Sequence, residues 1–141
     1  MTKSMLFLSW FIACIATFMS MYFSERLFLE PCELCWYQRI CMFPLVIILG
    51  RGAWKRDCTS ISYAIPFVLA GFGLALYHML MQEVFHFDPI GLCDFVHECS
   101  HPQFVHFFGM SLPIPVLSVV TFFILAVLLF IARNTDHAEH I

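Results

Sequence analysis

The residues best suited to chemistry are a Cys-x-x-Cys pair and an arginine within residues 30–39, EPCELCWYQR. Pro31 favours the start of a helix, so Cys32 and Cys35 are expected in its first turn. Backbone N–H groups and the helix dipole stabilise a thiolate there, and a cysteine pKa can fall to about 3.5–7.5. Arg39 follows Cys35 by one helical turn and is expected on the same face. The spacing predicts a thiol redox site beside a fixed cation. The alternative is an isolated structural disulfide, with Arg39 extended to the membrane interface.

The composition of the chain is that of a membrane protein. Hydrophobic residues make up 61% of the 141 residues and charged residues only 12%, with a mean hydropathy of +0.84. Soluble domains are about 45–50% apolar and about a quarter charged. The length allows a single domain and no separate soluble module. A net charge of −3 without a basic cluster argues against a nucleic-acid partner.

Four apolar stretches are long enough to cross about 30 Å of hydrocarbon. We therefore expect an all-α fold, an integral membrane four-helix bundle formed by one domain, residues 1–141. The spans are expected at about residues 5–23, 35–50, 61–81 and 113–132. The outer loops are then expected at about residues 24–34 and 82–112. The first stretch is interpreted as an uncleaved span, because its apolar core exceeds the roughly 7–15 residues of a secretory signal and no convincing cleavage site follows.

The distribution of basic residues predicts the orientation of these spans. Four spans place both termini on one side, together with five of the seven Lys and Arg residues; Arg26 and Arg39 fall on the other side. Basic residues concentrate on the cytoplasmic side, so the termini are expected to be cytoplasmic and both longer loops to face outward.

The paired cysteines fall on the predicted outer side. Cys32 and Cys35 lie at one outer loop, and Cys93 and Cys99 lie in the other. Disulfides persist in extracytoplasmic compartments and are rare in the cytosol, so this placement agrees with the charge bias. The remaining cysteines lie in spans or on the cytoplasmic side and are assigned no redox role: Cys14, Cys41 and Cys58.

The two pairs differ in geometry. A disulfide needs Cα atoms about 4.4–6.8 Å apart, which two cysteines in one helical turn can satisfy without refolding. Cys93 and Cys99 are six residues apart, so a bridge between them requires residues 94–98 to turn back. Such a bridge in an outer loop is expected to be accessible to another protein's thiol, and exposed disulfides are the labile, catalytic kind.

Histidines near these cysteines raise two further possibilities. Zinc could bind Cys93, His97, Cys99 and His101, but the usual Cys-x2–4-Cys spacing is absent, and no metal site is predicted. His78 is expected at the outer end of the third span, near the depth of Arg39, and is a candidate for contact with a bound cofactor.

These features together resemble a known family, the bacterial disulfide bond formation protein B family, DsbB, and within it the short BdbC-like members. The motif is Pro31-Cys32-x-x-Cys35-x-Tyr37-x-Arg39 at the start of the second of four spans. A second cysteine pair in the other outer loop and the segment GMSLP, residues 109–113, support the resemblance. It covers nearly the whole chain.

The resemblance implies a quinone-dependent protein-disulfide oxidoreductase of the bacterial inner membrane. A reduced, DsbA-like thioredoxin-fold partner outside the cytoplasm would attack the disulfide Cys93–Cys99. The electrons would pass to Cys32–Cys35 and then to a membrane quinone, either ubiquinone or menaquinone. The resemblance further implies that Cys93 forms the mixed disulfide with the partner. It implies that Cys35 contacts the quinone, that Arg39 binds and polarises it, and that His78 lies near it.

One departure and two alternatives accompany this interpretation. The loop between Cys93 and Cys99 is shorter than in the long-loop members, which argues against an intermediate in which it swings far to the first pair. A vitamin K epoxide reductase-like enzyme shares the chemistry but carries its Cys-x-x-Cys pair near the outer end of a late span. A non-enzymatic membrane partner or small transporter, stapled by two structural disulfides, is the alternative from a different class.

Overall fold

The computed structural model describes residues 2–26, 32–85, 90–91, 93, 104–107 and 110–139. Its four long helices are α1 (Thr2–Arg26), α2 (Glu33–Lys55), α3 (Thr59–Leu80) and α5 (Ile114–Glu139). All four are long and apolar enough to cross a membrane, which confirms the predicted all-α membrane bundle. The chain also forms a π-helical turn, η1 (Met81–Phe85), and two short strands, β1 (Phe104–Phe107) and β2 (Met110–Pro113).

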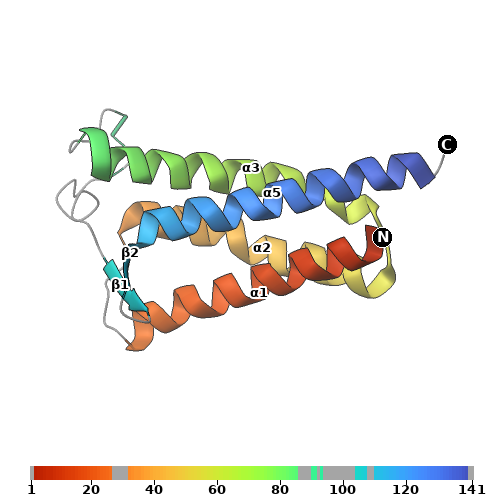
Figure 1. Ribbon diagram of the computed structural model, residues 1–141, viewed down its shortest axis with the longest axis horizontal. Helices are drawn as coiled ribbons and strands as arrows, with labels where there is room; N and C mark the ends of the chain where they lie inside the picture. Colours follow the sequence, from red (N-terminus) through yellow and green to blue (C-terminus); the bar gives the residue numbers. More distant parts are fainter. Residues whose placement is uncertain are drawn as a thin grey trace.

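The helices form a closed ring in which each one packs against two others. Helix α2 lies against α1 and α3, and α5 lies against α3 and α1 (Figure 1). Both termini and the turn between α2 and α3 are at one end of the bundle, and the strands are at the other end (Figure 1). The assignment of the terminal end to the cytoplasmic side stays a prediction from the distribution of basic residues.

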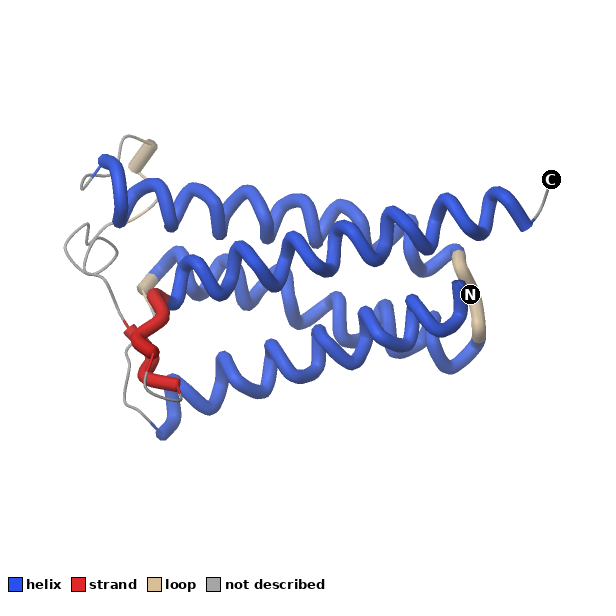
Figure 2. The backbone as a smooth tube through the Cα atoms, in the orientation of Figure 1, coloured by secondary structure: helices blue, strands red, loops and turns tan. Residues whose placement is uncertain are grey.

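The strands form a small antiparallel hairpin within the long loop predicted at about residues 82–112. Phe104 pairs with Pro113, and Phe107 pairs with Met110. The hairpin sits at the start of α5, at the end of the bundle where α2 also begins (Figure 2). It is a minor addition to an otherwise helical fold.

A short turn brings the first residues of α2 next to the last residues of α3. The two helices have 23 and 22 residues and are joined by residues 56–58 only. Arg56 adopts a left-handed conformation (φ 56°), and the Asp57 carboxylate accepts a hydrogen bond of 2.9 Å from the Thr59 N–H at the start of α3. Because the helices are antiparallel and nearly equal in length, the residues near Cys32 and those near His78 lie at the same level along the bundle axis.

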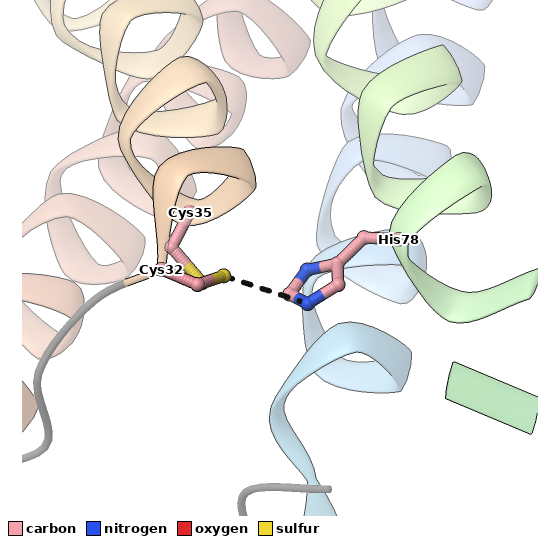
Figure 3. A group of neighbouring side chains, drawn as sticks. All are labelled: Cys32, Cys35 and His78. Carbon is pink, nitrogen blue, oxygen red and sulfur yellow. Dashed lines mark hydrogen bonds between the residues drawn. The ribbon is translucent and has the colours of Figure 1, made fainter. Parts of the chain in front are cut away.

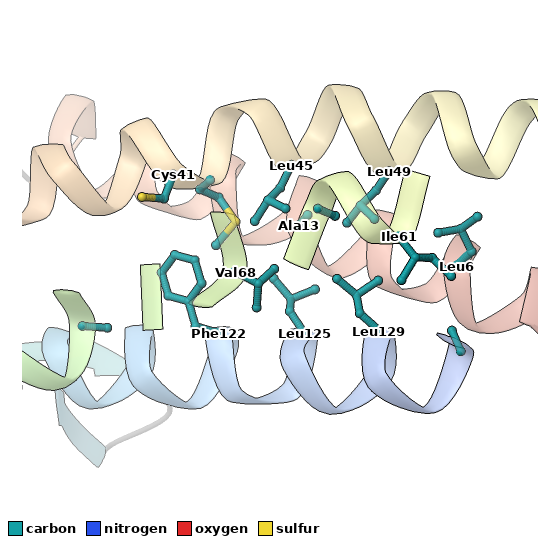
Figure 4. Close-up of a cluster of buried hydrophobic side chains, with 14 residues drawn as sticks. Leu6, Ala13, Cys41, Leu45, Leu49, Ile61, Val68, Phe122, Leu125 and Leu129 are labelled. Carbon is teal, nitrogen blue, oxygen red and sulfur yellow. The ribbon is translucent and has the colours of Figure 1, made fainter. Parts of the chain in front are cut away.

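The core is a column of aliphatic side chains with one aromatic ring. Leu45 and Leu49 from α2 meet Val68 from α3 and Leu125 and Leu129 from α5 (Figure 4). The outward faces are also apolar: Phe18 and Ile47 are 70% and 73% exposed. A surface of this kind suits lipid, where helices associate through close packing instead of exclusion of water.

Two glycines on α3 provide a prediction about this packing. A Cβ atom at Gly71 would overlap the ring of Phe122, whereas a Cβ atom at Gly73 would meet no atom within 4 Å. Gly71→Ala should therefore lower the free energy of unfolding by about 1–3 kcal/mol through overpacking. The matched control, Gly73→Ala, should leave it unchanged or raise it by up to about 1 kcal/mol through helix propensity. Denaturant unfolding of both variants in detergent micelles checks the pair; equal stabilities would show that α3 and α5 do not pack at Gly71.

Candidate redox site

The Cys-x-x-Cys pair lies where α2 begins. Cys32 is the residue immediately before the helix, in an extended conformation (φ −64°, ψ 166°), and its carbonyl accepts a 3.1 Å hydrogen bond from the Trp36 N–H. Cys35 is in the first turn, and the two Sγ atoms are 3.2 Å apart. Both cysteines are free thiols at this separation, since a disulfide bond is about 2.05 Å long. The structure therefore presents the dithiol form, and the Cys32–Cys35 disulfide stays a prediction.

His78 from the last turn of α3 completes a buried group with the two sulfurs. Its Nε2 atom lies 3.6 Å from the Cys32 Sγ atom, and its side chain is only 2% exposed (Figure 3). The Gln38 amide contacts Nδ1 of the ring at 3.3 Å, and the Gln82 amide contacts Nε2 at 3.1 Å. Gln82 belongs to η1, and π-helical turns of this kind occur frequently at functional sites. The ring is thus held by both glutamines and directed at Cys32.

The two glutamines were not identified from the sequence, although each left a signal. Gln82 follows His78 by four residues, so the two share a helix face. Gln38 is a polar residue inside an apolar span, where polar side chains usually face the bundle interior. His78 was predicted to lie near a cofactor at the depth of Arg39. The structure places it beside Cys32, and it does not line the cavity that contains Arg39. Its contact with a cofactor stays a prediction.

The surroundings of Cys32 stabilise its thiolate. Cys32 precedes the membrane-spanning helix, and its pKa is lowered from 9.0 to about 4. The largest cause is a hydrogen bond with the Cys35 thiol, followed by the contacts with His78; together they outweigh burial, which raises the pKa. A Cys32 thiolate is therefore available over the whole physiological pH range.

This low pKa predicts an unusual pH dependence of alkylation. In the reduced protein, the rate at which iodoacetamide modifies Cys32 should be nearly constant between about pH 5.5 and pH 8, because the thiolate already predominates above its pKa. In the denatured protein the rate should fall about tenfold per pH unit below an ordinary thiol pKa of about 8.5. His78→Ala should raise the pKa and restore part of this decline. Mass spectrometry of the peptide containing Cys32 measures the rates; the same decline in folded and denatured protein would contradict the assignment.

Arg39 is anchored between α2 and α1. Its side chain is 8% exposed, and it donates hydrogen bonds from Nε to the Ser20 hydroxyl at 2.9 Å and from Nη2 to the Ser20 carbonyl at 2.8 Å. Nη2 also donates to the Ser24 hydroxyl, and the guanidinium carbon is 5.5 Å from the centre of the Trp36 ring. The alternative in which Arg39 extends to the membrane interface does not fit these contacts. The cation is fixed inside the bundle.

Arg39 and Cys35 line one cavity of about 130 Å³ between α1, α2 and α5. Thr17 from α1 also lines it, and its buried hydroxyl has no hydrogen-bond partner among the described residues. The rest of the lining is mainly apolar. It includes Phe43 and Leu117, whose side chains are 38% and 41% exposed on the outside of the bundle. The cavity therefore opens toward the lipid-facing surface and has one cationic wall.

Cys93 reaches the same end of the bundle from the long loop. It is disulfide-bonded, and it packs in a small buried cluster with Cys32, Leu34 and Met81. We expected an accessible bridge; for Cys93 this is wrong, because its side chain is only 4% exposed. The Cys93 sulfur is buried against residues of α2 and η1, and the loop sequence alone does not predict this contact. No long swing is needed to bring Cys93 near the first pair.

Other predicted residues lie outside the site or outside the described part of the chain. Cys99, the predicted partner of Cys93, is not among the described residues, and neither are the two histidines once considered as zinc ligands, His97 and His101. Three further cysteines are free thiols and do not line the cavity that contains Arg39: Cys14, Cys41 and Cys58.

A membrane bundle with a thiol pair at one end is the arrangement expected of a membrane-embedded thiol oxidoreductase. The sequence profile described as "Disulfide bond formation protein DsbB" matches residues 2–132. A probable disulfide formation protein of Chlamydia trachomatis serovar D is 42% identical over 130 residues, which cover 92% of this chain and 93% of the relative. Disulfide bond formation protein C of Bacillus subtilis (strain 168) is 38% identical over 129 residues, 92% of each chain. No solved structure matches the chain significantly.

The chain therefore belongs to the DsbB family. It is a multi-pass inner-membrane protein with a role in disulfide bond formation, which implies oxidoreductase activity and a thiol–disulfide partner.

Proposed function

We propose that this protein reoxidises an extracytoplasmic, DsbA-like thioredoxin-fold partner and transfers the electrons through two cysteine pairs to a membrane quinone, ubiquinone or menaquinone. One observation carries the proposal: the Cys-x-x-Cys pair lies between two different surroundings. Cys32 shares a buried cluster with Cys93, and Cys35, which packs against this cluster, also lines the lipid-facing cavity with Arg39. A pair in this position can receive electrons on one side and release them on the other.

The cavity fits the head group of a quinone. The cavity has a volume of about 130 Å³. For comparison, an engineered apolar cavity of about 150 Å³ in another protein binds a single benzene ring. Two polar groups could face a carbonyl oxygen. One is the buried hydroxyl of Thr17, which has no hydrogen-bond partner among the described residues; the other is the guanidinium of Arg39, whose hydrogen bonds to Ser20 and Ser24 use only Nε and Nη2. Bound there, a quinone would accept two electrons and two protons. Arg39 would orient it and stabilise negative charge on its oxygen.

The steps at the outer pair are thiol–disulfide exchanges. A partner thiolate attacks the Cys93–Cys99 disulfide, one of these sulfurs leaves as a thiolate, and the second partner thiol then closes the partner's disulfide. Cys93 and Cys99 now carry the two electrons and attack Cys32–Cys35 in the same way. That exchange regenerates the outer disulfide and leaves Cys32 and Cys35 as the dithiol.

His78 assists the second exchange when Cys32 is the sulfur that leaves, because its ring lies 3.6 Å from the Cys32 sulfur and favours the thiolate. A leaving thiol with a lowered pKa departs faster. Leu34 and Met81 pack around Cys32 and Cys93, which keeps the reacting sulfurs close in a site of little water.

This assignment predicts which variant traps the partner. Cys99→Ala should accumulate a mixed disulfide between Cys93 and a thioredoxin-like partner. The Cys93 thiolate attacks the Cys32–Cys35 disulfide, which is the oxidant, and the partner thiolate then attacks the Cys93 sulfur and releases the inner cysteine as a thiolate. No outer sulfur remains to release the partner from Cys93. A partner that retains one active-site thiol should give a band of the complex on a non-reducing gel, and this band should be several-fold weaker or absent in Cys93→Ala. If the complex formed through Cys99 alone, the roles of the two outer cysteines would be reversed.

The experiment that tests the proposal is an anaerobic stoichiometry measurement. Purified protein is mixed with a reduced thioredoxin-like partner and a water-soluble quinone analogue. Quinol absorbance and partner thiols are followed together. One quinol should appear for each partner disulfide. Oxidation of the partner without formation of quinol would exclude the quinone as the electron acceptor. The absence of both reactions would favour a non-enzymatic protein in which the disulfides are structural.

A further inference from the structure

Three atoms at the start of α2 and the end of α3 form a group with the composition of a metal site. The sulfurs of Cys32 and Cys35 and a ring nitrogen of His78 all lie within 4.8 Å of one another (Figure 3). We propose that the dithiol form of the protein binds one soft divalent cation, of which Zn²⁺ is the reference, through these three side chains. Formation of the Cys32–Cys35 disulfide removes two of the ligands, so the site exists only in the reduced protein.

The distances are close to those of a tetrahedral zinc site. With Zn–S of about 2.3 Å and Zn–N of about 2.0–2.1 Å, two sulfurs lie about 3.8 Å apart and a sulfur and a nitrogen about 3.5 Å apart. The observed separations are 3.2 Å between the sulfurs and 3.6 Å between Cys32 Sγ and His78 Nε2. The sulfurs therefore need to separate by about half an ångström, which a change of the Cys35 rotamer can provide.

The second ring nitrogen of His78 has the outer contact that metal-bound histidines require. Such a histidine almost always directs its other N–H at a polar acceptor, which fixes the ring. The Gln38 amide lies 3.3 Å from Nδ1, and its oxygen can accept this hydrogen bond once the amide turns over. The contact of Gln82 with Nε2 must be given up when the metal binds. Gln38 and Gln82 therefore have opposite expected effects on affinity.

The ligand set determines the class of ion. Two thiolates and an imidazole favour Zn²⁺ and similar soft cations over Mg²⁺ and Ca²⁺, which prefer oxygen ligands. Two cysteines and one histidine with an open fourth position also occur in catalytic zinc sites. The Cys-x-x-Cys pair has the spacing of zinc ligands, but the third ligand, His78, comes from another helix, so the sequence alone does not reveal the site.

The chemical balance of binding is simple. Two metal–sulfur bonds and one metal–nitrogen bond form, the thiols lose their remaining protons, and no electrons move. Both sulfurs are then occupied, so the disulfide cannot form until the ion leaves. A soft metal ion is thus expected to hold the protein in the reduced state. This site does not depend on the electron acceptor, so metal binding and quinone reduction can each fail alone.

The test uses the full-length protein with only Cys32 and Cys35 retained and the other five cysteines replaced by alanine. The reduced protein is titrated anaerobically with Cd²⁺, and the thiolate-to-metal absorption is followed in the ultraviolet. One ion should bind per chain, and Zn²⁺ should displace it. No binding should remain once the disulfide has formed. His78→Ala should weaken binding by about tenfold or more, and Gln38→Leu by about tenfold.

Two controls and a second measurement keep the test decisive. Gln82→Leu should bind the ion more tightly than the unaltered protein, because the contact with Nε2 that the ion must displace is gone. His106→Ala, a histidine substitution in β1, should retain the full affinity. Co²⁺ added to the reduced protein with all its cysteines should give the visible absorption of a tetrahedral thiolate site, and oxidation should abolish it. Equal affinity in His78→Ala, binding by the disulfide form, or the absence of any bound ion in both measurements would overturn the proposal.

Discussion

Replacing Cys35 by serine is expected to lower quinone reduction by at least about a thousandfold, the scale on which loss of a reacting group reduces turnover. Cys35 is the sulfur that lines the cavity with Arg39, and its hydroxyl replacement can neither form the disulfide nor carry the electrons. Cys32→Ser should have an effect of the same size, because Cys32 is the sulfur that shares a cluster with Cys93. The measurement is steady-state quinol formation with a reduced thioredoxin-like partner.

The matched control is another buried cysteine of the same helix. Cys41 lies deeper in α2 as part of the hydrophobic core, and Cys41→Ala should keep nearly full activity if the protein remains folded. The same holds for Cys14→Ala and Cys58→Ala. Normal turnover by Cys35→Ser, or complete loss in folded Cys41→Ala, would contradict the assignment of the redox pair.

Arg39→Ala is expected to raise the apparent KM for quinone by about 10- to 100-fold, the loss that corresponds to a charge-assisted hydrogen bond of about 1.5–3 kcal/mol. Arg39→Lys should cause a smaller but clear rise, because an ammonium group keeps the charge without the planar fork of donors. Lysine also cannot reproduce the simultaneous contacts with Ser20 and Ser24 that fix the guanidinium. The KM for the thiol partner should change little, since Cys93 packs with Cys32 and does not line the cavity that contains Arg39.

Two variants separate a cofactor contact from a general effect of charge. Ser24→Ala removes one anchor of Arg39 and should raise the KM for quinone by less than Arg39→Ala does. Arg51→Lys changes an exposed arginine at the opposite end of α2 and should have no effect. If Arg39→Lys behaved like the unaltered protein for quinone while partner affinity fell, Arg39 would be a contact for the partner.

The helices and the position of the redox pair follow from local sequence features. Long apolar stretches separated by polar turns predicted four spans, and each of the four long helices contains most of one predicted span. The Cys-x-x-Cys motif lies at the start of α2 because Cys32 precedes a helix-forming segment. Arg39 was expected on the face of Cys35, and both line one cavity. These are relations over a few residues, which the helical period determines.

The contacts between helices could not be predicted in this way. His78 meets Cys32 because α2 and α3 have nearly the same length and a short turn joins them. Ser20 and Ser24 anchor Arg39 because α1 presents this face to α2, and the sequence alone does not show which helix lies opposite that face. The burial of Cys93 depends on Leu34 and Met81, which belong to different helical segments. Each of these depends on how separate elements pack.

The most direct test of the proposed electron path is the redox state of the Cys32–Cys35 pair in membranes of controlled quinone content. Membrane vesicles containing the protein are acid-quenched, their thiols are alkylated with a maleimide reagent that adds mass, and the pair is scored by mass spectrometry. With an oxidised quinone pool the pair should be a disulfide. In quinone-depleted vesicles given a reduced partner it should accumulate as the dithiol, and added quinone should reoxidise it within the time of turnover. In Arg39→Ala this reoxidation should be slowed about 10-fold or more. A pair that stays oxidised with or without quinone, and with or without the partner, would contradict the proposed function.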